Sequence, residues 1–238
     1  MTFRPYWGMT IACALLLALL CWLGTWQLQR LQWKLALIAQ VDRQIHMRPI
    51  DLNQPGMLIE EPQTNYMHVT VKGRFDNDKE VYLFQSSVSG DPGYHVLTPL
   101  IAADGRAFLV DRGFVPKEML APAARQAGQQ TGEVQVTGIW RWPEGKGGFT
   151  PPADAVHRIW YWHDLDAFQA VDHIHLAQPG VIEADATPNP GGWPLGGQTV
   201  VNFRNQHLSY AVTWFGLAAC LLGVWLAYHV SRGRIGFK

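Results

Sequence analysis

The sequence predicts a membrane protein in which two transmembrane α-helices bracket a mainly antiparallel β domain of the α+β class. Two stretches without acidic or basic residues, 10–29 and 205–230, predict the helices, because roughly 20 apolar residues cross about 30 Å of hydrocarbon as an α-helix. Between these stretches, short runs that alternate apolar and polar residues predict strands. The mean hydropathy of −0.04 hides this division, because the polar middle of the chain offsets the apolar ends.

The chain of 238 residues therefore divides at the ends of the two predicted helices. Roughly 170 residues remain outside the helices, which is an ordinary size for one globular domain. The expected parts are a cytoplasmic N-terminus (1–9), a first transmembrane helix (10–29), a periplasmic β-rich domain (30–204), a second transmembrane helix (205–230) and a cytoplasmic C-terminus (231–238).

Basic residues beside the second helix set the expected orientation. Arg232, Arg234 and Lys238 follow this helix, whereas only Arg204 precedes it closely, and basic flanks favour the cytoplasmic side. The basic residues within 30–48 favour the opposite orientation when taken alone. We give the C-terminal flank more weight, because long domains cross a membrane largely regardless of their charge.

The first apolar stretch predicts an uncleaved anchor rather than a signal peptide. It is longer than the roughly 7–15 apolar residues of a signal peptide, and no small-residue cleavage site follows it. Nothing rich in Arg and Ser precedes it, as a mitochondrial transit peptide would be. We therefore expect a multi-pass protein of the bacterial plasma (inner) membrane.

The middle of the chain predicts a helix followed by strands. Residues 31–45 continue the first helix beyond the membrane until Pro49 ends the pattern. Asp104 and Gly105 form a dipeptide typical of a hairpin turn. The expected strands are 66–75, 80–85, 94–101, 107–114, 133–142, 156–162 and a short one at 181–184, with a loop or short helix at 116–132 and a linker rich in Pro and Gly at 188–197.

Charge and cysteine content exclude several functions. The net charge is +0, so no basic surface indicates a nucleic-acid partner. Cys13, Cys21 and Cys220 all lie in the predicted transmembrane helices, so the domain has neither a disulfide framework nor a thiolate metal site. The sequence contains no nucleophile elbow, phosphate-binding glycine loop or HExxH motif. We therefore do not expect an enzyme.

His207, at the start of the second predicted helix, is the leading candidate for a ligand. Tyr210, Trp214 and Leu217 follow it at spacings that place them on the same helical face. A neutral imidazole is a common axial ligand of haem iron, and a porphyrin ring could lie against Tyr210 and Trp214. The alternative is that His207 merely lies at the membrane interface within the usual belt of aromatic residues.

Trp26 lies at the corresponding depth on the first predicted helix. Small, polar and aromatic residues meet there in the segment Gly24-Thr25-Trp26-Gln27. Small residues let two transmembrane helices approach closely. A pocket at the outer membrane surface, lined by both helices, is the prediction that follows.

Other histidines have plainer interpretations. His173 and His175 would point to one face of a strand and could clip a metal ion, but we favour a solvated strand edge because only Asp172 lies nearby as a further ligand. His157 and His163 flank an aromatic run and are expected on the surface.

Two further polar sites are expected to be structural. His229, near the end of the second predicted helix, marks the cytoplasmic interface. Asp111 and Arg112 come at the end of an expected strand, where we favour an ion pair or a turn cap over catalysis.

Several segments in order along the chain resemble the Surfeit locus protein 1 family. The run LGTWQLQRL at 23–31, followed by Trp33 and Lys34, is similar to the family's N-terminal signature. GRF at 73–75 and VDRGFVP at 110–116 resemble its central motifs, and NQHLSYAVTWF at 205–215 resembles its C-terminal signature. The resemblance covers both predicted helices and points between them, although the Gly- and Pro-rich residues 142–152 do not align.

The resemblance implies an assembly factor, a chaperone for cytochrome c oxidase in the respiratory chain, that binds haem a and assists its insertion into the catalytic subunit. His207 matches the proposed haem ligand of the family and is therefore also the expected metal ligand, with Tyr210, Trp214 and Trp26 as expected haem contacts. The implied partners are haem a synthase, the oxidase catalytic subunit and the lipid bilayer. The alternative is a membrane scaffold that stabilises an oxidase assembly intermediate without binding haem.

Overall fold

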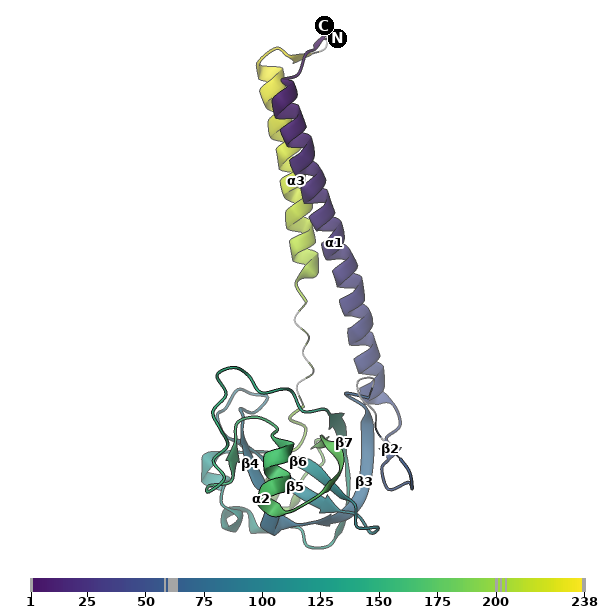
Figure 1. Ribbon diagram of the computed structural model, residues 1–238, viewed down its shortest axis with the longest axis vertical. Coiled ribbons are helices and arrows are strands. Elements are labelled where there is room, and N and C mark those ends of the chain that lie inside the picture. The colour runs from purple at the N-terminus through teal and green to yellow at the C-terminus, as the bar shows by residue number, and fades with distance from the viewer. Residues whose placement is uncertain are drawn as a thin grey trace. The chain divides into compact units, whose positions relative to one another are not determined.

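The computed structural model describes residues 2–57, 59, 64–199, 201, 203 and 205–236. The chain folds as two compact units (Figure 1): unit 1 contains Met1–Gln40 with Asn202–Lys238, and unit 2 contains Val41–Val201. Arg204 and Lys238, which contribute to the expected orientation, lie outside the described residues.

Two long helices make up most of unit 1. The first, α1 (Trp7–His46), contains the first predicted transmembrane segment and its extension in one continuous helix. The second, α3 (His207–Ser231), matches the second predicted segment. Both are long and apolar enough to cross a membrane. A short antiparallel pair, β1 (Thr2–Phe3) with β10 (Ile235–Gly236), joins the ends of the chain.

Small residues form the contact between α1 and α3. Ala211 and Ala218 are buried on α3, and a Cβ atom added to Gly24 of α1 would lie 2.7–2.9 Å from the ring of Phe215. This close approach is the one expected from the small residues of the predicted pocket. Large apolar side chains elsewhere on both helices are exposed, including Leu15 at 69% and others at similar levels. An apolar outer surface of this kind fits a hydrocarbon environment.

Unit 2 contains a mixed sheet rather than a purely antiparallel one. Its strands lie in the order β2-β3-β7-β9-β6-β5-β4-β8, and a further pairing of β3 with β5 closes β3, β7, β9, β6 and β5 into a small barrel. The pairs β2–β3, β4–β8 and β6–β9 are parallel. The bounds are β2 (Ile50–Asp51), β3 (His68–Phe75), β4 (Val81–Phe84), β5 (Tyr94–Ile101), β6 (Ala107–Val115), β7 (Glu133–Arg141), β8 (Ile159–Trp160) and β9 (Leu176–Ala184).

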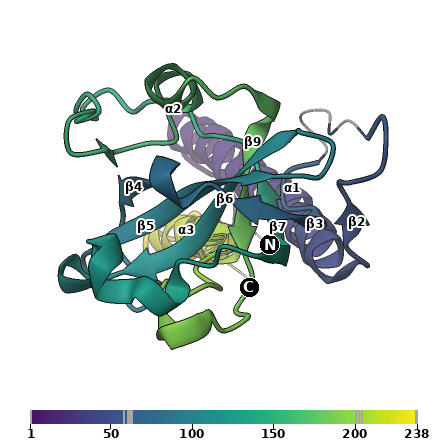
Figure 2. The same cartoon turned by 90° about the horizontal axis from the view of Figure 1, so that it is seen from below.

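Strand β6 is buried along its whole length because it separates two hydrophobic clusters. Phe108 and Val110 point into the first cluster with Trp140. Leu109, one residue out of phase, points into the second cluster with Phe168. Phe168 belongs to α2 (Leu165–Asp172), which lies beside β9 (Figure 2). Alternate side chains of one strand therefore support both clusters, and each fully buried apolar side chain contributes about 1.5–3 kcal/mol.

The segment around His173 and His175 is not a strand, so the solvated strand edge expected there is wrong, and the less favoured histidine clip loses its geometric basis. Asp164 caps the first turn of α2 by accepting a hydrogen bond from the Ala167 N–H at 3.0 Å. His173 ends this helix in the left-handed conformation, with φ of 50°. Strand β9 begins only after His175, at Leu176. The alternation that would place both imidazoles on one face is therefore absent.

Three other boundaries differ from the sequence prediction. The strand expected at 181–184 begins earlier, at Leu176. Only Ile159–Trp160 of the expected strand 156–162 pairs in the sheet. The expected linker 188–197 packs on β6, where Phe114 and Leu195 exchange backbone hydrogen bonds of 2.9 Å. Gly113 has φ of +113° there, and a Cβ atom would collide with the Leu195 carbonyl. Short 3-10 helices, Lys117–Met119 and Pro122–Gly128, occupy the expected loop or short helix 116–132.

Candidate functional site

His207 is the first residue of α3, and its ring is held by a hydrogen bond to α1. Its Nδ1 lies 2.8 Å from Oε1 of Gln27, a side chain that is almost completely buried. Because the amide oxygen accepts, Nδ1 carries the proton and Nε2 keeps its lone pair. Within the described part of the chain, Nε2 has no hydrogen bond. The imidazole is therefore oriented by one nitrogen and available through the other.

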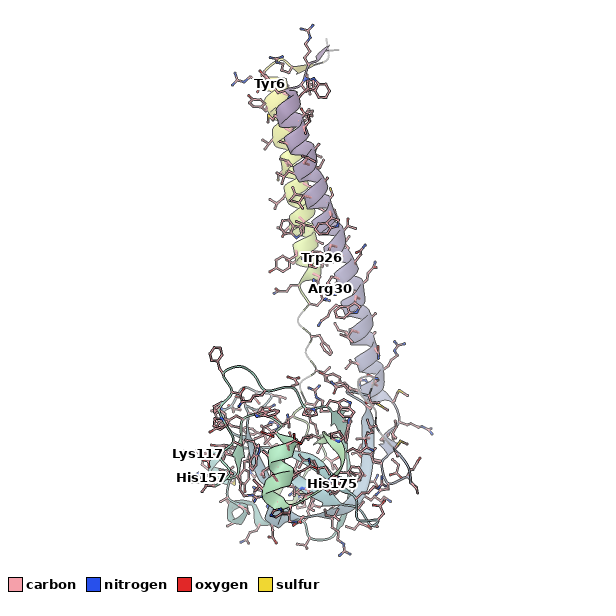
Figure 3. All side chains as sticks on the ribbon, in the orientation of Figure 1. Tyr6, Trp26, Arg30, Lys117, His157 and His175 are labelled. Atoms are coloured by element: carbon pink, nitrogen blue, oxygen red, sulfur yellow. The ribbon has the colours of Figure 1, made fainter. Side chains whose placement is uncertain are left out.

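The aromatic residues predicted to accompany His207 do not all lie on the same side of α3. Trp214 lies in the contact with α1, and its Nε1 is buried without a hydrogen-bond partner among the described residues. Tyr210 and Leu217 are 52% and 48% exposed. Trp26 is 45% exposed on α1 (Figure 3). His207 and Trp214 thus share the inner face, while Tyr210 and Trp26 present aromatic surface outside it.

Gln27 is a functional candidate because it orients His207, although the sequence alone gives it no role. The least exposed positions of α1 recur at intervals of three and four residues, as in a coiled coil. A polar Gln in this apolar series is the signal that could have identified it. The series is Thr10, Cys13, Leu17, Leu20, Gly24 and Gln27.

Cations follow Gln27 on α1. The Arg30 guanidinium lies 4.4 Å from the ring centroid of Trp33, and the Lys34 ammonium lies 5.0 Å from that of Phe203. Arg30 is exposed (Figure 3). Arg30 and Lys34 therefore place positive charge one to two helical turns after Gln27, beyond the apolar part of α1.

His229 at the other end of α3 is buried, which differs from the interface role expected for it. Its Nε2 accepts the Tyr6 N–H at 3.1 Å, and its Nδ1 lies 2.8 Å from the Trp225 carbonyl oxygen. Both ring nitrogens are thus engaged within the protein. His229 ties the start of α1 to the end of α3, and it is not available as a ligand.

Asp111 in unit 2 forms both the ion pair and the turn contact expected for it. Its carboxylate lies 2.7 Å from His95 Nδ1 and accepts the Gly113 N–H at 2.8 Å. Burial would raise the pKa of Asp111, but the His95 charge and hydrogen bond lower it below the ordinary value. Asp111 lies within β6 rather than at its end. These contacts give it a structural role.

Arg112 points to the opposite side of β6 from Asp111 and is also structural. It donates to Asn77 Oδ1 at 3.3 Å and to the Gly128 carbonyl, and its guanidinium lies 4.3 Å from the ring centroid of Phe75. Burial lowers the pKa of Arg112 to about 10, so it stays charged at neutral pH.

The remaining predicted histidines do not assemble into a metal site. His173 and His175 are exposed, and His157 pairs with the neighbouring Asp154 at 2.7 Å on the surface. Among the described residues, no three His, Cys, Asp or Glu side chains are placed to hold a metal ion together. His163 differs from the surface position expected for it, because its Nε2 is buried and lines a cavity of unit 2.

The fold defines a class of protein with two candidate membrane-spanning helices and one mixed β-barrel domain. A histidine is oriented at the contact between the two helices. The chain belongs to the SURF1 family, whose sequence profile matches residues 14–219. This confirms the resemblance found in the sequence signatures.

Individual relatives are similar over most of the chain. The chain is 38% identical to Surfeit locus protein 1 of Mus musculus over 228 residues, which cover 90% of this chain and 73% of the mouse protein. It is 37% identical to Surfeit locus protein 1 of Homo sapiens over 219 residues, covering 85% and 71% of the two chains. The SURF1-like protein of Monosiga brevicollis is 37% identical over 225 residues, covering 89% and 84%.

Proposed function

We propose that this chain is an assembly factor for cytochrome c oxidase that binds haem a through His207 and assists its insertion into the catalytic subunit. Membership of the SURF1 family supports the assembly role. The haem part rests on one observation, the 2.8 Å hydrogen bond between His207 Nδ1 and Gln27 Oε1. This bond fixes the tautomer that leaves Nε2 free to bind iron.

The residues around His207 suit a haem as transient cargo. His207 would supply one axial nitrogen, and Trp26, Tyr210 and Trp214 offer aromatic surface to the porphyrin. The buried Trp214 Nε1, which lacks a hydrogen-bond partner among the described residues, offers a donor to a polar substituent. Arg30 offers positive charge to propionate groups.

A single axial ligand favours release of the cargo. A receiving site that supplies two histidines binds the iron more tightly than His207 alone, so transfer is downhill. We propose that unit 2 selects the receiving protein, with haem a synthase as the donor of the cargo and the oxidase catalytic subunit as its acceptor. No residue of the chain needs to perform bond chemistry in this role.

The proposed location is the bacterial plasma (inner) membrane, with α1 and α3 crossing the bilayer. The exposed apolar side chains of both helices support this arrangement, since exposure to water would be unfavourable. The basic residues Arg232 and Arg234 after α3 support a cytoplasmic C-terminus and therefore a periplasmic unit 2. Reaction of introduced cysteines with a membrane-impermeant maleimide in intact cells tests this orientation.

An absorption spectrum tests haem binding directly. The purified full chain, co-expressed with haem a synthesis, should show a Soret band that is lost or shifted in His207→Ala. His175→Ala is the matched control, because it removes an exposed histidine of unit 2 and should leave the spectrum unchanged. A spectrum that is the same in wild type and His207→Ala would contradict the assignment.

The second candidate function is a scaffold that stabilises an oxidase assembly intermediate without binding haem. The partly buried hydrogen bond between His207 and Gln27 favours it, because this bond also contributes to holding the two helices together. Co-purification with the oxidase catalytic subunit separates the two functions. A haem carrier loses the cofactor and keeps the partner in His207→Ala, whereas a scaffold contains no haem in either form.

A further inference from the structure

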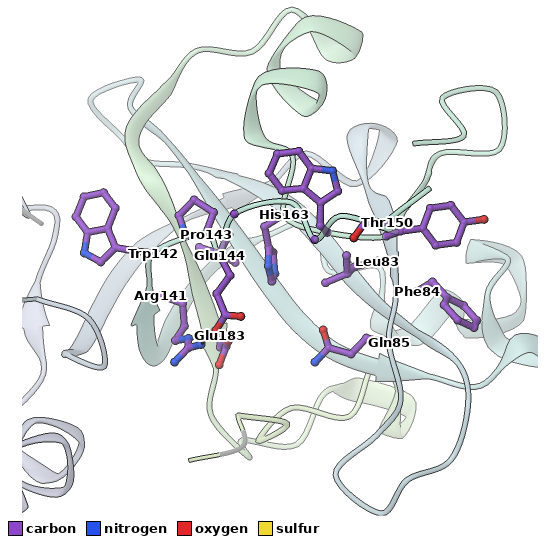
Figure 4. A pocket seen from close by; sticks show the side chains of 15 residues that line it. Leu83, Phe84, Gln85, Arg141, Trp142, Pro143, Glu144, Thr150, His163 and Glu183 are labelled. Carbon is purple, nitrogen blue, oxygen red and sulfur yellow. Dashed lines mark hydrogen bonds and ion pairs between the residues drawn. The ribbon is translucent and has the colours of Figure 1, made fainter. Parts of the chain in front are cut away.

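Two adjoining cavities lie at one end of the unit 2 barrel. The larger, of about 280 Å³, lies between the end of β4, the loop after β7 and the segment before α2 (Figure 4). The smaller, of about 100 Å³, reaches His95. Gln85, Arg141 and Glu183 line both cavities, so the two form a continuous site.

The floor of this site contains buried nitrogen atoms that lack hydrogen-bond partners among the described residues. They are His163 Nε2 and Arg141 Nη1. The His95 side chain is only 3% exposed and that of Arg141 15%. In Figure 4, His163, Arg141, Gln85 and Glu183 converge on the centre of the larger cavity. Buried polar groups without partners are costly and rare, so their convergence indicates a ligand.

The unpaired groups require an acceptor. A guanidinium such as that of Arg141 only donates. Burial lowers the pKa of His95, but the charge and hydrogen bond of Asp111 outweigh it and raise the pKa above its ordinary value. Burial lowers the pKa of His163, whose neutral ring offers one further N–H or lone pair. The permanently charged Arg141 guanidinium repels a metal ion and attracts an anionic oxygen.

Glu183 limits the charge of this anion. Its Oε1 lies 3.5 Å from Arg141 Nε, and the largely exposed Glu144 carboxylate accepts from Arg141 Nη2 at 3.3 Å. Among the described residues, Nη1 is therefore the nitrogen of this guanidinium with neither a hydrogen bond nor an ion pair. Burial raises the pKa of Glu183, so the site already disfavours a second negative charge. A singly charged carboxylate therefore fits better than a doubly charged phosphate.

Aromatic side chains form the rim of the larger cavity. Phe84 and Tyr161 are 51% and 38% exposed, with ring centroids 6.0 Å apart, and Trp142 lies on the wall of the same cavity. Such a rim favours an apolar or aromatic body.

We propose that this site binds a monocarboxylate attached to an aromatic or apolar body. The carboxylate faces Arg141 and His163, and the body packs against Phe84 and Tyr161. The assignment does not depend on haem binding by His207.

Benzoate is the probe that tests this inference. Isothermal titration of the full chain in detergent micelles should give a Kd of about 1 mM or below. The neutral isostere benzamide should bind at least about 10-fold more weakly, because it cannot form charge-assisted hydrogen bonds. Arg141→Gln should weaken benzoate binding by at least about 10-fold for the same reason. His175→Gln, an exposed histidine outside both cavities, is the matched control and should bind like the wild type.

His163→Leu provides a second test that does not depend on Arg141. The His163 side chain has no hydrogen bond within the described residues, so its removal leaves no partner unpaired. Weaker benzoate binding in this variant supports the site even if Arg141→Gln fails to fold. Equal binding of benzoate and benzamide, absence of benzoate binding at about 10 mM, or an unchanged Kd in His163→Leu would overturn the proposal.

A peptide ending in phenylalanine, with either a free or an amidated C-terminus, distinguishes the sources of the carboxylate. Tighter binding of the free peptide than of benzoate assigns the site to a polypeptide terminus. Tighter binding of benzoate assigns it to a small organic acid. Both results depend on the carboxylate and support the proposal, whereas equal binding of free and amidated peptide together with no response to benzoate contradicts it.

Discussion

Asp111→Ala should strongly destabilise unit 2, because it leaves His95 buried without its partner. The Asp111 and His95 side chains are 5% and 3% exposed, and their N–O distance is 2.7 Å. The substitution removes this charge-assisted bond and the bond from the Gly113 N–H at 2.8 Å. Breaking a buried pair of this kind costs about 3–5 kcal/mol. At roughly 2–4 °C per kcal/mol for a chain of this size, Tm should fall by roughly 6–20 °C.

Asp154→Ala is the matched control, because it removes the partner of His157 at the same N–O distance of 2.7 Å. Those side chains are 41% and 72% exposed, so water replaces the lost contact. Thermal unfolding of the full chain in detergent, followed by tryptophan fluorescence, should leave this variant indistinguishable from wild type. Equal changes in the two variants would refute the argument that burial determines the strength of the pair.

The difference between wild type and Asp111→Ala should also depend on pH. The pKa of His95 is raised above 6.5, so its contribution is complete below that value and is lost as the pH rises through the folded-state pKa. The pKa of Asp111 is lowered below 3.8, so its contribution is present above that value and is lost as the pH falls through the folded-state pKa. The Tm difference should therefore be largest between these values and decrease in alkaline solution. A Tm difference that is constant into alkaline solution would refute the ionic assignment.

Three further substitutions test the contact between the helices, a buried ion pair of the barrel and the orientation of the proposed haem ligand. Gly24→Val should weaken the contact of α1 with α3 and lower Tm, since the added Cβ would lie 2.7–2.9 Å from the Phe215 ring. Adding Phe215→Ala to this variant should restore Tm, and a Tm that stays low would contradict this cause. Arg125→Met should lower the free energy of unfolding by about 3–5 kcal/mol, because Arg125 and Glu80 pair at 2.5 Å with side chains 1% and 4% exposed. In a double-mutant cycle, the variant that also carries Glu80→Gln should lose less free energy of unfolding than the sum of the two single variants. Additive losses would argue against the pair. Gln27→Leu should reduce haem retention by about 10–100-fold by freeing the His207 ring; the exposed neighbour Gln29→Leu should leave the Soret band unchanged, and equal loss in both variants would exclude an orienting role.

The sequence predicted those elements that depend only on residues close together in the chain. Alternation placed β5 and β6 to within one residue, and the Asp104-Gly105 turn joins them as expected, with Gly105 at φ of +84°. The parallel pairing of β6 with β9 joins segments far apart in the chain, so no local pattern could show it. This pairing and the β3–β5 closure turn the expected antiparallel sheet into a barrel.

Helix α2 is not predicted, although residues typical of a helix start precede it. Asp164 followed by Asp166 is a typical start of a helix, with a capping side chain and an acidic first turn. The helix has only 8 residues, too few for a clear apolar repeat. The HIH tripeptide favoured a strand instead, and the expected solvated strand edge is therefore wrong.

His95 and His207 are both held through Nδ1 but differ in the charge of their partners, and this difference matches their surroundings. His95 is paired with the Asp111 carboxylate inside unit 2, which raises the pKa of the ring against the effect of burial. His207 is paired with the neutral amide of Gln27 within an apolar helix pair, where a carboxylate would be expensive to bury. An amide fixes the ring without supplying the negative charge that strengthens a histidine ligand. In the proposed role, Gln27 therefore presents Nε2 to iron while keeping the bond weak enough for transfer to a site with two histidines.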